Sequence, residues 1–539
     1  MGDLLEHLFN TPLFEPRQRY HLPLRAYMDL TIRRMHAIFS AGILNNDFWL
    51  GQPQQSRFSE FCESMSWLSA FDYALHSSVV DHMIAVDVVL NHGSPRQIAR
   101  YREETIGMRK VYAFGCTEVA VGTDVRNVQT RVTYDRQQHR LILHSPSPEA
   151  CKCWIGNALH AAQVLMVLAR LEVEGEDQGH HWFRVIVRKR ENGRLLPGIT
   201  MMACDPKGGI HANQVAAICF CNVSLPVSAL MQRHARFTRD GVFISDLPKQ
   251  ERFINALGTF LQERVLFLTG IRQSASVAAH LSYRFAQHRL VQASGSRAAL
   301  LNNPLFLQRL YVSQLKALAL KYLDQSIRRR FESEWAQPKR RKELHGLAAL
   351  GKSFGAWVGL EVIGLARELC GSQGFHHYNQ IVTQRMDCEV GNTFAGDSSV
   401  MAYQVMKDAL NRLRFVGHEP ANIAQRIEAK IIKKRRRSGD FSHGEAIGVT
   451  YARALDLIIQ EVETGRLLNS QTLADLTGVF APQLHPWGLF SQCIGNKCAT
   501  RSQVERLATL LKPPQFLISA PIDNADYIQR FTRALYEEQ

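Results

Sequence analysis

Hydrophobic positions in the first 110 residues recur with the spacing of helices, and runs of β-branched residues are few. The pattern is clearest where the chain carries Leu24, Met28, Leu30, Ile32 and Met35. This spacing places the apolar side chains on one side of a helix, where they can pack against a core. We therefore expect a helical N-terminal domain over residues 1–110.

From about residue 111 the pattern changes to short alternating segments, which indicate strands. They are separated by Gly, Pro and Asn, the residues that favour turns. The segments are Gln129 to Tyr134, Leu141 to His144, Val164 to Leu171, Trp182 to Val187 and Ala216 to Val223. Residues 111–246 are therefore predicted to form a β domain.

Long amphipathic stretches return after residue 253, and each is long enough for a helix of several turns. They cover residues 255–290, 305–333 and 345–370. We expect a C-terminal helical bundle over residues 247–416, followed by a second helical domain over residues 417–539. The chain shows no internal repeat and no low-complexity tract.

The composition is that of a globular protein, with 46% hydrophobic and 21% charged residues in a chain of 539 residues. Its formal charge of +15 suits a polyanionic small ligand, a membrane surface or a nucleic acid. The basic runs lie beside helical pattern and are interpreted mainly as solvated helix ends. A basic nucleic-acid-binding protein is a third hypothesis, but no aromatic and basic platform supports it, so we expect no nucleic-acid partner. No uninterrupted apolar stretch reaches the length of a membrane span.

The 11 cysteines are odd in number, form no CxxC pair and follow no secretory signal, which favours free thiols in a reducing compartment. Cys151 and Cys153, like Cys219 and Cys221, are two residues apart and are expected to pack on one face of a strand. We expect no metal site. The chain does not end in a Ser-Lys-Leu peroxisomal signal, so we expect the cytoplasm if the source is bacterial, with the peroxisome as the alternative.

Several stretches resemble the motifs of acyl-CoA oxidases and acyl-CoA dehydrogenases, in the order found in that family. Residues 117–123 resemble the Thr-Glu-x-x-x-Gly-(Ser/Thr) signature, and residues 152–157 the Lys-Trp-Trp-Pro-Gly-Gly loop. Leu-Pro-Gly-Ile-Thr recurs at 196–200, and a strand ending in proline at 220–226. Farther on, residues 370–375 and 393–397 match Cys-Gly-Gly-x-Gly-Tyr and Thr-Phe-Glu-Gly-(Asp/Glu).

The resemblance implies an α+β multidomain fold of the acyl-CoA oxidase type, with a β-barrel-like middle domain between helical ones. It also implies FAD as the cofactor, an acyl-CoA thioester as the substrate and a homodimer. The expected activity is α,β-oxidation to a trans-2-enoyl-CoA in fatty-acid β-oxidation. The helical extension after residue 416 favours the oxidase branch, which passes electrons to oxygen. Acyl chain length and branching are not evident from the sequence.

The family's cofactor contacts fall on a definite set of residues in this chain. They are Thr117, Gly156, Arg289, Gly371, Gln373, Gly374 and Thr393. Small residues let the backbone approach a pyrophosphate, and a guanidinium pairs with its charge. Arg289 is implied to reach the flavin of the neighbouring subunit. Simpler interpretations remain: a turn at Thr117, a helix-stop loop at Gly371 and Gly374, a surface arginine at 289, and core filling by Trp154.

The usual catalytic base is absent, because Ala395 occupies the position of the glutamate in Thr-Phe-Glu-Gly. A methyl group cannot accept the substrate's α-proton. The backbone N–H of Ala395 could still polarise the thioester carbonyl, as the resemblance implies. Asp397 is a poor substitute, since ordinary oxidases carry an acidic residue there in addition to their base.

Glu263 is the candidate for a relocated base. Isovaleryl-CoA and long-chain acyl-CoA dehydrogenases have Glu-Arg at the place of Glu263-Arg264, and in the isovaleryl enzyme the base position also carries a small residue. A solvated helix residue or an ion-pair partner is the simpler interpretation. Asn157, Ala120 and Ser372 also replace glycines of the family. A catalytically impaired flavoprotein, or a structural subunit of an oxidase complex, is therefore the alternative.

Overall fold

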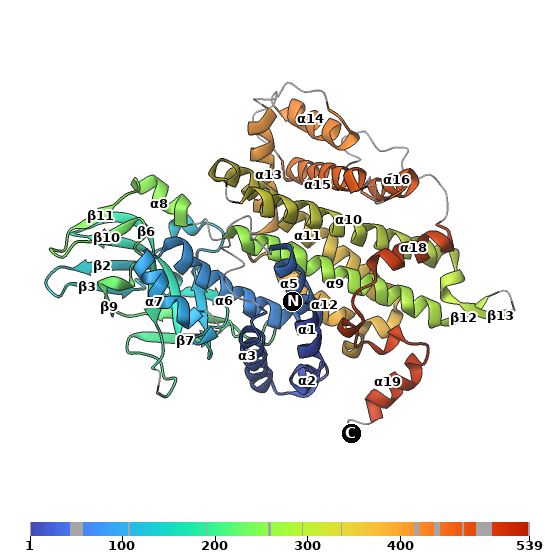
Figure 1. The fold of residues 1–539 in the computed structure, drawn as a ribbon, viewed down its shortest axis with the longest axis horizontal. Helices are drawn as coiled ribbons and strands as arrows, with labels where there is room; N and C mark the ends of the chain where they lie inside the picture. The colour runs from blue at the N-terminus through green and yellow to red at the C-terminus, as the bar shows by residue number, and fades with distance from the viewer. Residues whose placement is uncertain are drawn as a thin grey trace. The chain divides into compact units, whose positions relative to one another are not determined.

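The computed structural model is described over most of the chain (Figure 1). The described residues are 2–43, 58–105, 108–189, 191–256, 260–293, 295–335, 337–413, 420–435, 442–465, 468–480, 484 and 499–536. The chain divides into two compact units. Unit 1 comprises residues 1–51 and 74–263, and unit 2 comprises residues 52–73 and 264–539.

Unit 1 begins with helices and continues with strands, as the hydrophobic pattern predicts. Its helices are α1 (Gly2–Phe9), α2 (Gln18–His21), α3 (Leu24–Ser40), α6 (Tyr73–His92), α7 (Pro95–Thr105) and α8 (Lys249–Ala256). Its strands are β1 (Tyr112–Gly115), β2 (Arg131–Asp135), β3 (Arg140–His144), β4 (Lys152–Ile155), β5 (Val164–Val173), β6 (Glu176–Ile186), β7 (Ile199–Ala203), β8 (Ala216–Phe220), β9 (Val223–Pro226), β10 (Ala235–Phe237) and β11 (Phe243–Ser245). The five predicted strand segments are thus all found.

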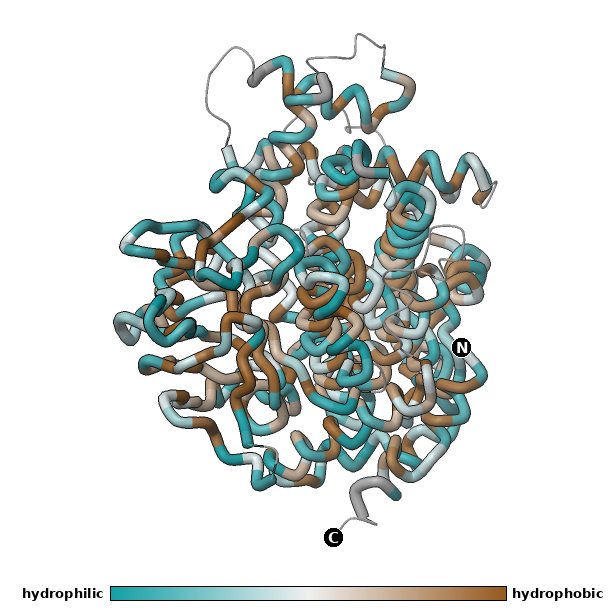
Figure 2. Tube along the Cα trace, turned by 60° about the vertical axis from the view of Figure 1, so that its left-hand side comes forward, coloured by the Kyte–Doolittle hydropathy of each residue, from teal (hydrophilic) through white to brown (hydrophobic). Residues whose placement is uncertain are grey.

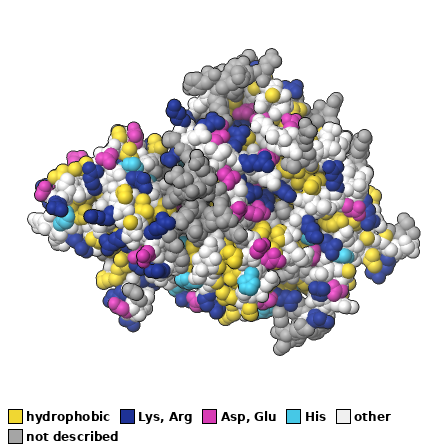
Figure 3. Space-filling model, in the orientation of Figure 1, with side chains coloured by type: hydrophobic (Ala, Val, Ile, Leu, Met, Phe, Trp, Pro, Cys, Tyr) yellow, Lys and Arg dark blue, Asp and Glu magenta, His cyan; other side chains and the backbone are white. Residues whose placement is uncertain are grey.

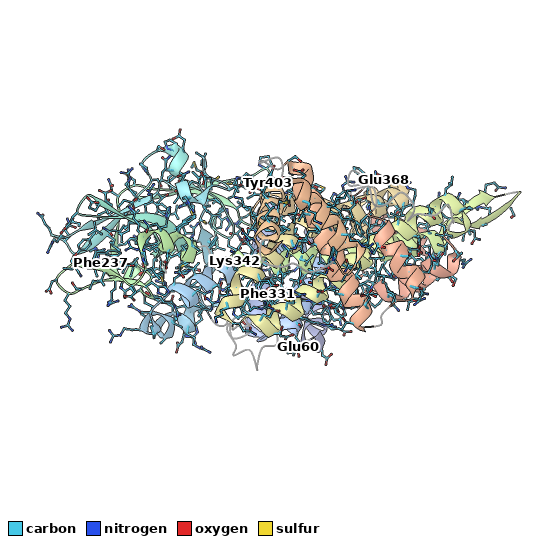
Figure 4. The ribbon with its side chains drawn as sticks, turned by 90° about the horizontal axis from the view of Figure 1, so that it is seen from above. Glu60, Phe237, Phe331, Lys342, Glu368 and Tyr403 are labelled. Atoms are coloured by element: carbon cyan, nitrogen blue, oxygen red, sulfur yellow. A yellow bond between two sulfur atoms is a disulfide. The ribbon has the colours of Figure 1, made fainter. Side chains whose placement is uncertain are left out.

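The strands of unit 1 form a large sheet and a small one. In the large sheet the order is β1-β5-β2-β3-β9, with β6 paired to β5. In the small sheet the order is β4-β8-β7. A further pair, β10 and β11, brings Phe237, labelled in Figure 4, onto Tyr134 with ring centroids 4.3 Å apart.

Strand β5 is buried on both faces, which explains its nearly continuous hydrophobic sequence. Leu165 and Val167 belong to the core cluster that includes the small sheet's Ile155, Ala216 and Ile218. The alternate residues, Val164, Met166 and Leu168, pack in a second cluster with residues of α6. The large sheet therefore lies between α6 and the small sheet.

Unit 2 consists mainly of helices, whose hydrophobic and hydrophilic positions alternate along the tube in Figure 2. They are α5 (Phe58–Phe71), α9 (Phe260–His288, of which residues 264–288 belong to unit 2), α10 (Pro304–Glu334), α11 (Arg341–Leu369), α12 (Ile381–Glu389), α13 (Ser398–Leu413), α14 (Ile423–Arg435), α15 (His443–Gly465), α16 (Ser470–Gly478), α18 (Arg501–Leu511) and α19 (Tyr527–Tyr536). A short hairpin, β12 (Leu290–Ala293) and β13 (Ser296–Ala299), follows α9. The three long predicted helices correspond to α9, α10 and α11.

Aromatic stacking and buried ion pairs hold the helices of unit 2 together. Phe331 of α10, labelled in Figure 4, stacks on Phe58 of α5 with ring centroids 6.1 Å apart. Asp324 of α10 is fully buried and accepts a hydrogen bond from Thr269 Oγ1 at 2.6 Å. The Arg272 guanidinium lies 3.3 Å from the same carboxylate. These three polar groups of the core are therefore paired with one another.

Two helices, α6 and α11, are apolar and long enough to cross a membrane by length and composition alone. The sequence pattern did not single them out, because charged residues interrupt α11. In the structure 94% and 83% of their apolar windows are buried inside the protein. This burial is what the core helices of a globular protein show.

Candidate functional site

The loop after β1 is tied to β4 through Thr117. Thr117 Oγ1 donates to the carbonyl of Cys153 at 2.6 Å, and the Cys153 N–H donates to the Thr117 carbonyl at 3.0 Å. Thr117 is half-buried. The hydroxyl oxygen can still accept a hydrogen bond while its proton is donated to Cys153. Thr117 can therefore stabilise the turn and contact a ligand at the same time.

Lys152 and Glu118 form a buried ion pair directly behind this loop. Lys152 Nζ lies 3.0 Å from Glu118 Oε1 and donates to the carbonyl of Cys116 at 2.9 Å. Glu118 also accepts from the backbone N–H groups of Gln129 and Thr130 at 2.7 and 2.9 Å. The lysine and glutamate of the two motifs therefore fix the loop that carries Thr117.

Trp154 is not core filling, because its side chain is 65% exposed. It lies at a bulge where the pairing of β4 with β8 shifts, and its φ of 63° is left-handed. The bulge turns the indole outward, and the nearby strand β7 exposes Met202. The small sheet thus presents apolar surface next to Thr117, on which a flat ring could stack.

Gly156 and Asn157 are held by α6, an arrangement that the sequence did not indicate. A Cβ at Gly156 would lie 1.9 Å from Asp81 Oδ2, so packing against α6 alone requires glycine. Asn213 Oδ1 accepts from the Asn157 N–H at 3.2 Å, and Asn213 Nδ2 donates to Asp81 Oδ2 at 2.7 Å. Burial raises the pKa of the Asp81 carboxyl to about 7.

The side chain of Asn157 does not crowd the surface of this loop. It is fully buried, and its Nδ2 donates to the carbonyl of Ser78 at 2.7 Å. The φ of Asn157 is 60°, a left-handed value that asparagine tolerates better than most residues. The replacement of a family glycine by Asn157 is therefore accommodated by packing against α6. Ala120 and Ser372 are exposed.

Glu263 lies in the first turn of α9 and is only 8% exposed, so it is not a solvated residue. Its carboxylate acts electrostatically on the buried thiol of Cys116, whose pKa is raised to about 12, first by burial and further by Glu263 and Glu118. Cys116 precedes Thr117. Within unit 1, the candidate base is therefore close to the loop that carries a predicted flavin contact.

Ala395 lies on a loop with left-handed backbone, at φ 58°, followed by Gly396 at φ 94°. In unit 2, Arg264 Nε donates to the Ala395 carbonyl at 3.1 Å. Lys352, fully buried in α11, donates to Ser398 Oγ at 3.1 Å and to the Asn392 carbonyl at 3.3 Å. Side chains from two helices, α9 and α11, thus fix this loop.

Thr393, on the same loop, is exposed, and its hydroxyl donates to the Val390 carbonyl at 3.0 Å.

Burial, and then the charges of Arg264 and Arg341, lower the pKa of His345 to about 4. His345 is therefore neutral at physiological pH and adds no positive charge beside Arg264.

The predicted pyrophosphate residues lie after α9 and after α11. Arg289 is exposed, and its Nη1 donates to the Tyr527 hydroxyl at 3.3 Å. Gly371 has φ 54° and open space around it, whereas a Cβ at Gly374 would lie 2.2 Å from the Arg367 carbonyl. Gln373 accepts from Asn379 Nδ2 at 3.0 Å through its carbonyl and at 2.9 Å through Oε1. Helix termination explains the left-handed Gly371, which follows the C-cap of α11 and also leaves room for a ligand. The close approach to the last turn of α11 explains Gly374.

Cys151 and Cys219 form a disulfide, with Cα atoms 4.5 Å apart, so the expectation of free thiols is wrong for this pair. Sequence spacing could not show it, because β4 and β8 bring together residues 68 apart. Cys153 and Cys221 are free thiols. Among the described residues no group of three or more His, Cys, Asp and Glu side chains could hold a metal ion.

Comparison with protein families gives two matches to this chain. Residues 113–223 match the acyl-CoA dehydrogenase middle domain, and residues 257–410 match the acyl-CoA oxidase C-alpha1 domain. Among solved structures, acyl-CoA oxidase1 from Yarrowia lipolytica superposes with a TM-score of 0.84 at 16% identity, covering 99% of this chain and 89% of that one. Arabidopsis thaliana acyl-CoA oxidase 1 gives 0.81 at 17% identity, covering 99% and 91%.

Curated relatives agree with these matches. Acyl-coenzyme A oxidase acox-3 of Caenorhabditis elegans is 28% identical over 57% of this chain, which spans 48% of that protein. Peroxisomal acyl-coenzyme A oxidase 3 of Homo sapiens is 26% identical over 77% of this chain and 60% of its own length. The chain spans about half to three fifths of the relatives' length.

A unit of N-terminal helices with a two-sheet β domain, followed in the chain by a helical unit, has the fold of the acyl-CoA oxidases. The two matched domains follow each other along the chain in the same order as the motifs found in the sequence. Two segments of the chain thus match domains of acyl-CoA dehydrogenases and acyl-CoA oxidases, and the chain is similar to acyl-CoA oxidases in sequence and in fold.

Proposed function

We propose that this protein catalyses the FAD-dependent α,β-oxidation of an acyl-CoA to a trans-2-enoyl-CoA and passes the electrons to oxygen. The family relationship supports this activity. A Caenorhabditis elegans acyl-CoA oxidase of the same fold is described as complexed with FAD and ATP. The basic surface, where Lys and Arg are spread among acidic residues on the face shown in Figure 3, suits a substrate that carries phosphates.

The position of Glu263 carries the proposal. The Glu263 carboxylate is 8% exposed and acts electrostatically on Cys116, the residue before Thr117, where the flavin contact is predicted. Its chain neighbour Arg264 donates to the Ala395 carbonyl, on the loop that carries the usual base in relatives. The burial of Glu263 and its electrostatic effect on Cys116 support it as the group that takes over from the missing glutamate.

The residues present fit a flavin. Thr117 and the exposed Trp154 offer a hydroxyl and an aromatic face, and Gly371 leaves open space for a phosphate. Thr117, Gly156 and Thr393 would hold the ring, while Arg289, Gly371, Gln373 and Gly374 would hold the pyrophosphate. FAD, when bound, accepts the hydride that leaves the substrate's β-carbon.

The chain's own residues would contribute proton transfer and electrostatic stabilisation. Glu263 would remove the α-proton as a general base. The Ala395 N–H would donate to the thioester oxygen, which gains negative charge as that proton leaves. Arg264 would fix the orientation of this N–H through its bond to the Ala395 carbonyl. Lys152, paired with Glu118, would keep Thr117 in place.

Replacement of Glu263 by glutamine tests the proposal. In an anaerobic titration with acyl-CoAs of different chain length, Glu263→Gln should slow flavin bleaching by roughly 10² to 10⁴-fold, the usual contribution of a general base. Flavin content should be unchanged. Glu251→Gln, at an exposed glutamate on α8, is the matched control and should bleach at the wild-type rate. Admission of air then shows whether oxygen reoxidises the flavin.

A second variant separates a moved base from a lost one. Ala395→Glu in the Glu263→Gln background restores a carboxylate at the family's usual position and should recover part of the bleaching rate. If Glu263→Gln bleaches as fast as wild type, Glu263 is not the base.

The substitution at Ala395 supports a second candidate function, that of a catalytically impaired flavoprotein or a structural subunit of an oxidase complex. Such a protein would be yellow but would not bleach with any acyl-CoA. A wild-type protein that binds no flavin contradicts both candidates.

We also propose a homodimer, because the resemblance directs Arg289 to the flavin of a partner subunit. The names of the human and Arabidopsis relatives place them in peroxisomes, which favours the peroxisome over a bacterial cytoplasm. Light scattering of the flavin-loaded protein measures the assembly, and a fluorescent fusion expressed in cells measures the compartment.

A further inference from the structure

The segment from Pro514 to Tyr536 is bound to the residues around the predicted pyrophosphate site. It consists of two short 3-10 turns, Gln515–Leu517 and Pro521–Asp523, and of helix α19. It contacts the rest of unit 2 through hydrogen bonds at three places: the end of α9, Arg289, and the turn at residues 377–380. It also contacts α5 through the aromatic pair of Phe516 and Trp67.

The first place is the end of α9, which leads directly into Arg289. Asp523 Oδ1 lies 3.0 Å from His280 Nε2 and 3.3 Å from Arg284 Nε, and the Asp523 carbonyl accepts from Arg284 at 3.0 Å. Asp523 is 4% exposed. Burial raises the pKa of its carboxyl, but hydrogen bonds from His280 and Gln515 outweigh burial and hold that pKa below its usual value.

The second contact is with Arg289 itself. The hydroxyl of Tyr527, a residue 2% exposed, accepts from Arg289 Nη1 at 3.3 Å. The Tyr527 ring also packs edge-on against Phe285, with centroids 5.8 Å apart. The guanidinium is exposed, but its orientation is set by a buried residue from another part of the chain.

The third contact leads to Gln373. Asn379, which is fully buried, donates to the carbonyl and the side chain of Gln373, and its Oδ1 accepts from the Ile522 N–H at 3.3 Å. The adjacent Gln380 donates to the Leu517 carbonyl at 3.2 Å and accepts from the Ser519 N–H at 3.1 Å. Gln373 is thus linked to the segment through one side chain.

We infer that residues 514–536 complete the binding site for the flavin pyrophosphate, with Tyr527 and Asp523 as positioning residues for Arg289 and Asn379 as the positioning residue for Gln373. A guanidinium and an amide that are fixed before binding lose less conformational entropy when they bind phosphate. The inference rests on the proposed function, since it assumes that Arg289 and Gln373 bind FAD.

Flavin selectivity provides a test that general destabilisation would not reproduce. FAD contains a pyrophosphate and FMN does not, so loss of positioning should weaken FAD alone. With protein stripped of flavin, Tyr527→Phe and Asp523→Asn should each raise the Kd for FAD roughly tenfold, as expected for loss of a hydrogen bond to a charged group. The Kd for FMN should stay at the wild-type value in both variants, and the unfolding temperature of flavin-free Tyr527→Phe should equal that of the wild type.

Tyr283→Phe is the matched control. It removes a tyrosine hydroxyl from α9, the helix that leads into Arg289, and that hydroxyl accepts from Gln287 at 2.6 Å. Its Kd for FAD should equal the wild-type value.

Three outcomes overturn the inference. Unchanged FAD affinity in Tyr527→Phe and Asp523→Asn, with normal FAD binding by the wild type, removes it and leaves the proposed function intact. Tighter FAD binding in Tyr527→Phe also removes it, because the segment would then compete with the phosphates. A wild-type protein that binds no FAD removes the inference and the proposed function together.

Discussion

Lys152 and Glu118 face each other at 3.0 Å with both side chains fully withdrawn from solvent. Each belongs to a different family motif, and together they hold the loop between β1 and β2 against β4. Burial lowers the pKa of Lys152, although the negative charge of Glu118 opposes this shift. Burial would raise the pKa of Glu118, but the charge of Lys152 and the hydrogen bonds from Gln129 and Thr130 outweigh burial and lower it. The Glu118 carboxylate accepts three hydrogen bonds, which stabilise its charged form.

Removal of the lysine should be costly. Lys152→Met leaves the Glu118 carboxylate buried without its cation, and loss of one partner of a buried pair costs about 3–5 kcal/mol. Urea denaturation measures this loss. Lys249→Met, which breaks an exposed pair with Asp177, should cost less than about 1 kcal/mol. A similar, small loss in both variants would contradict a structural role for Lys152.

The same pair predicts a loss of stability in acid. The pKa of Glu118 is lower in the folded than in the unfolded protein, so its contribution is present above the unfolded value of about 4.3 and is lost as the pH falls below it. The Glu118→Gln variant should show a flatter decline of the unfolding free energy below about pH 4.5. Denaturation between pH 3 and 6 provides the measurement, and a decline as steep as in wild type would show that other carboxylates dominate.

Gly156 and Asp81 should be energetically coupled. A methyl group at 156 would lie 1.9 Å from Asp81 Oδ2, so Gly156→Ala must displace that carboxylate from Asn213. We expect a loss of about 1–3 kcal/mol, and a much smaller effect of the same substitution in an Asp81→Ala background. Gly122→Ala, at a position with open space, should be neutral or slightly stabilising. Additive effects at 156 and 81 would contradict the contact.

Asp81 should make the protein less stable as the pH rises from about 4 to 7. Burial raises its folded pKa to about 7, whereas an unfolded aspartate has a pKa near 3.9. The folded state therefore holds the proton longer, and its stabilising contribution, full below pH 4, is lost as the pH rises through 7. Asp81→Asn, which cannot ionise, should remove this slope and exceed wild type in stability at pH 8. Thermal unfolding from pH 4 to 8 measures it; an unchanged slope would assign the effect to other groups.

The Cys151–Cys219 disulfide closes a loop of the β domain, with the two residues 68 positions apart. Its removal by Cys151→Ser should cost about 2–4 kcal/mol, the typical value for such a cross-link. Cys221→Ser, at an exposed free thiol near the end of β8, should have little effect. Peptide mapping without reductant should find the linked peptides. Their absence in protein kept under oxidising conditions would contradict the pairing.

The sequence alone was sufficient to predict the longer strands and helices and to show the family resemblance. Strand β5 could be recognised because its apolar run is long and β-branched, and α9, α10 and α11 because their periodicity persists over several turns. The motifs at 117–123 and 393–397 were visible because they are contiguous in the chain. The bounds of the four predicted domains remain predictions, because the division of the chain into two units does not decide them.

Contacts between distant segments could not be predicted in the same way. Trp154 could be assigned to the core or to a ligand surface until the bulge in β4 showed its indole exposed. Asp81 lies in an ordinary helical pattern, and only folding brings it to Gly156. The linkage of Tyr527 with Arg289 spans 238 residues.

The order of residues determined which segments are helix or strand, which motifs the chain carries, and that the usual base is an alanine, because these are local properties. Tertiary structure decided that Glu263 is buried, that Cys151 and Cys219 are joined, and that Tyr527 accepts a hydrogen bond from Arg289. The physical reason is that burial and pairing depend on which surfaces meet when the chain folds, and a local pattern does not record the partner.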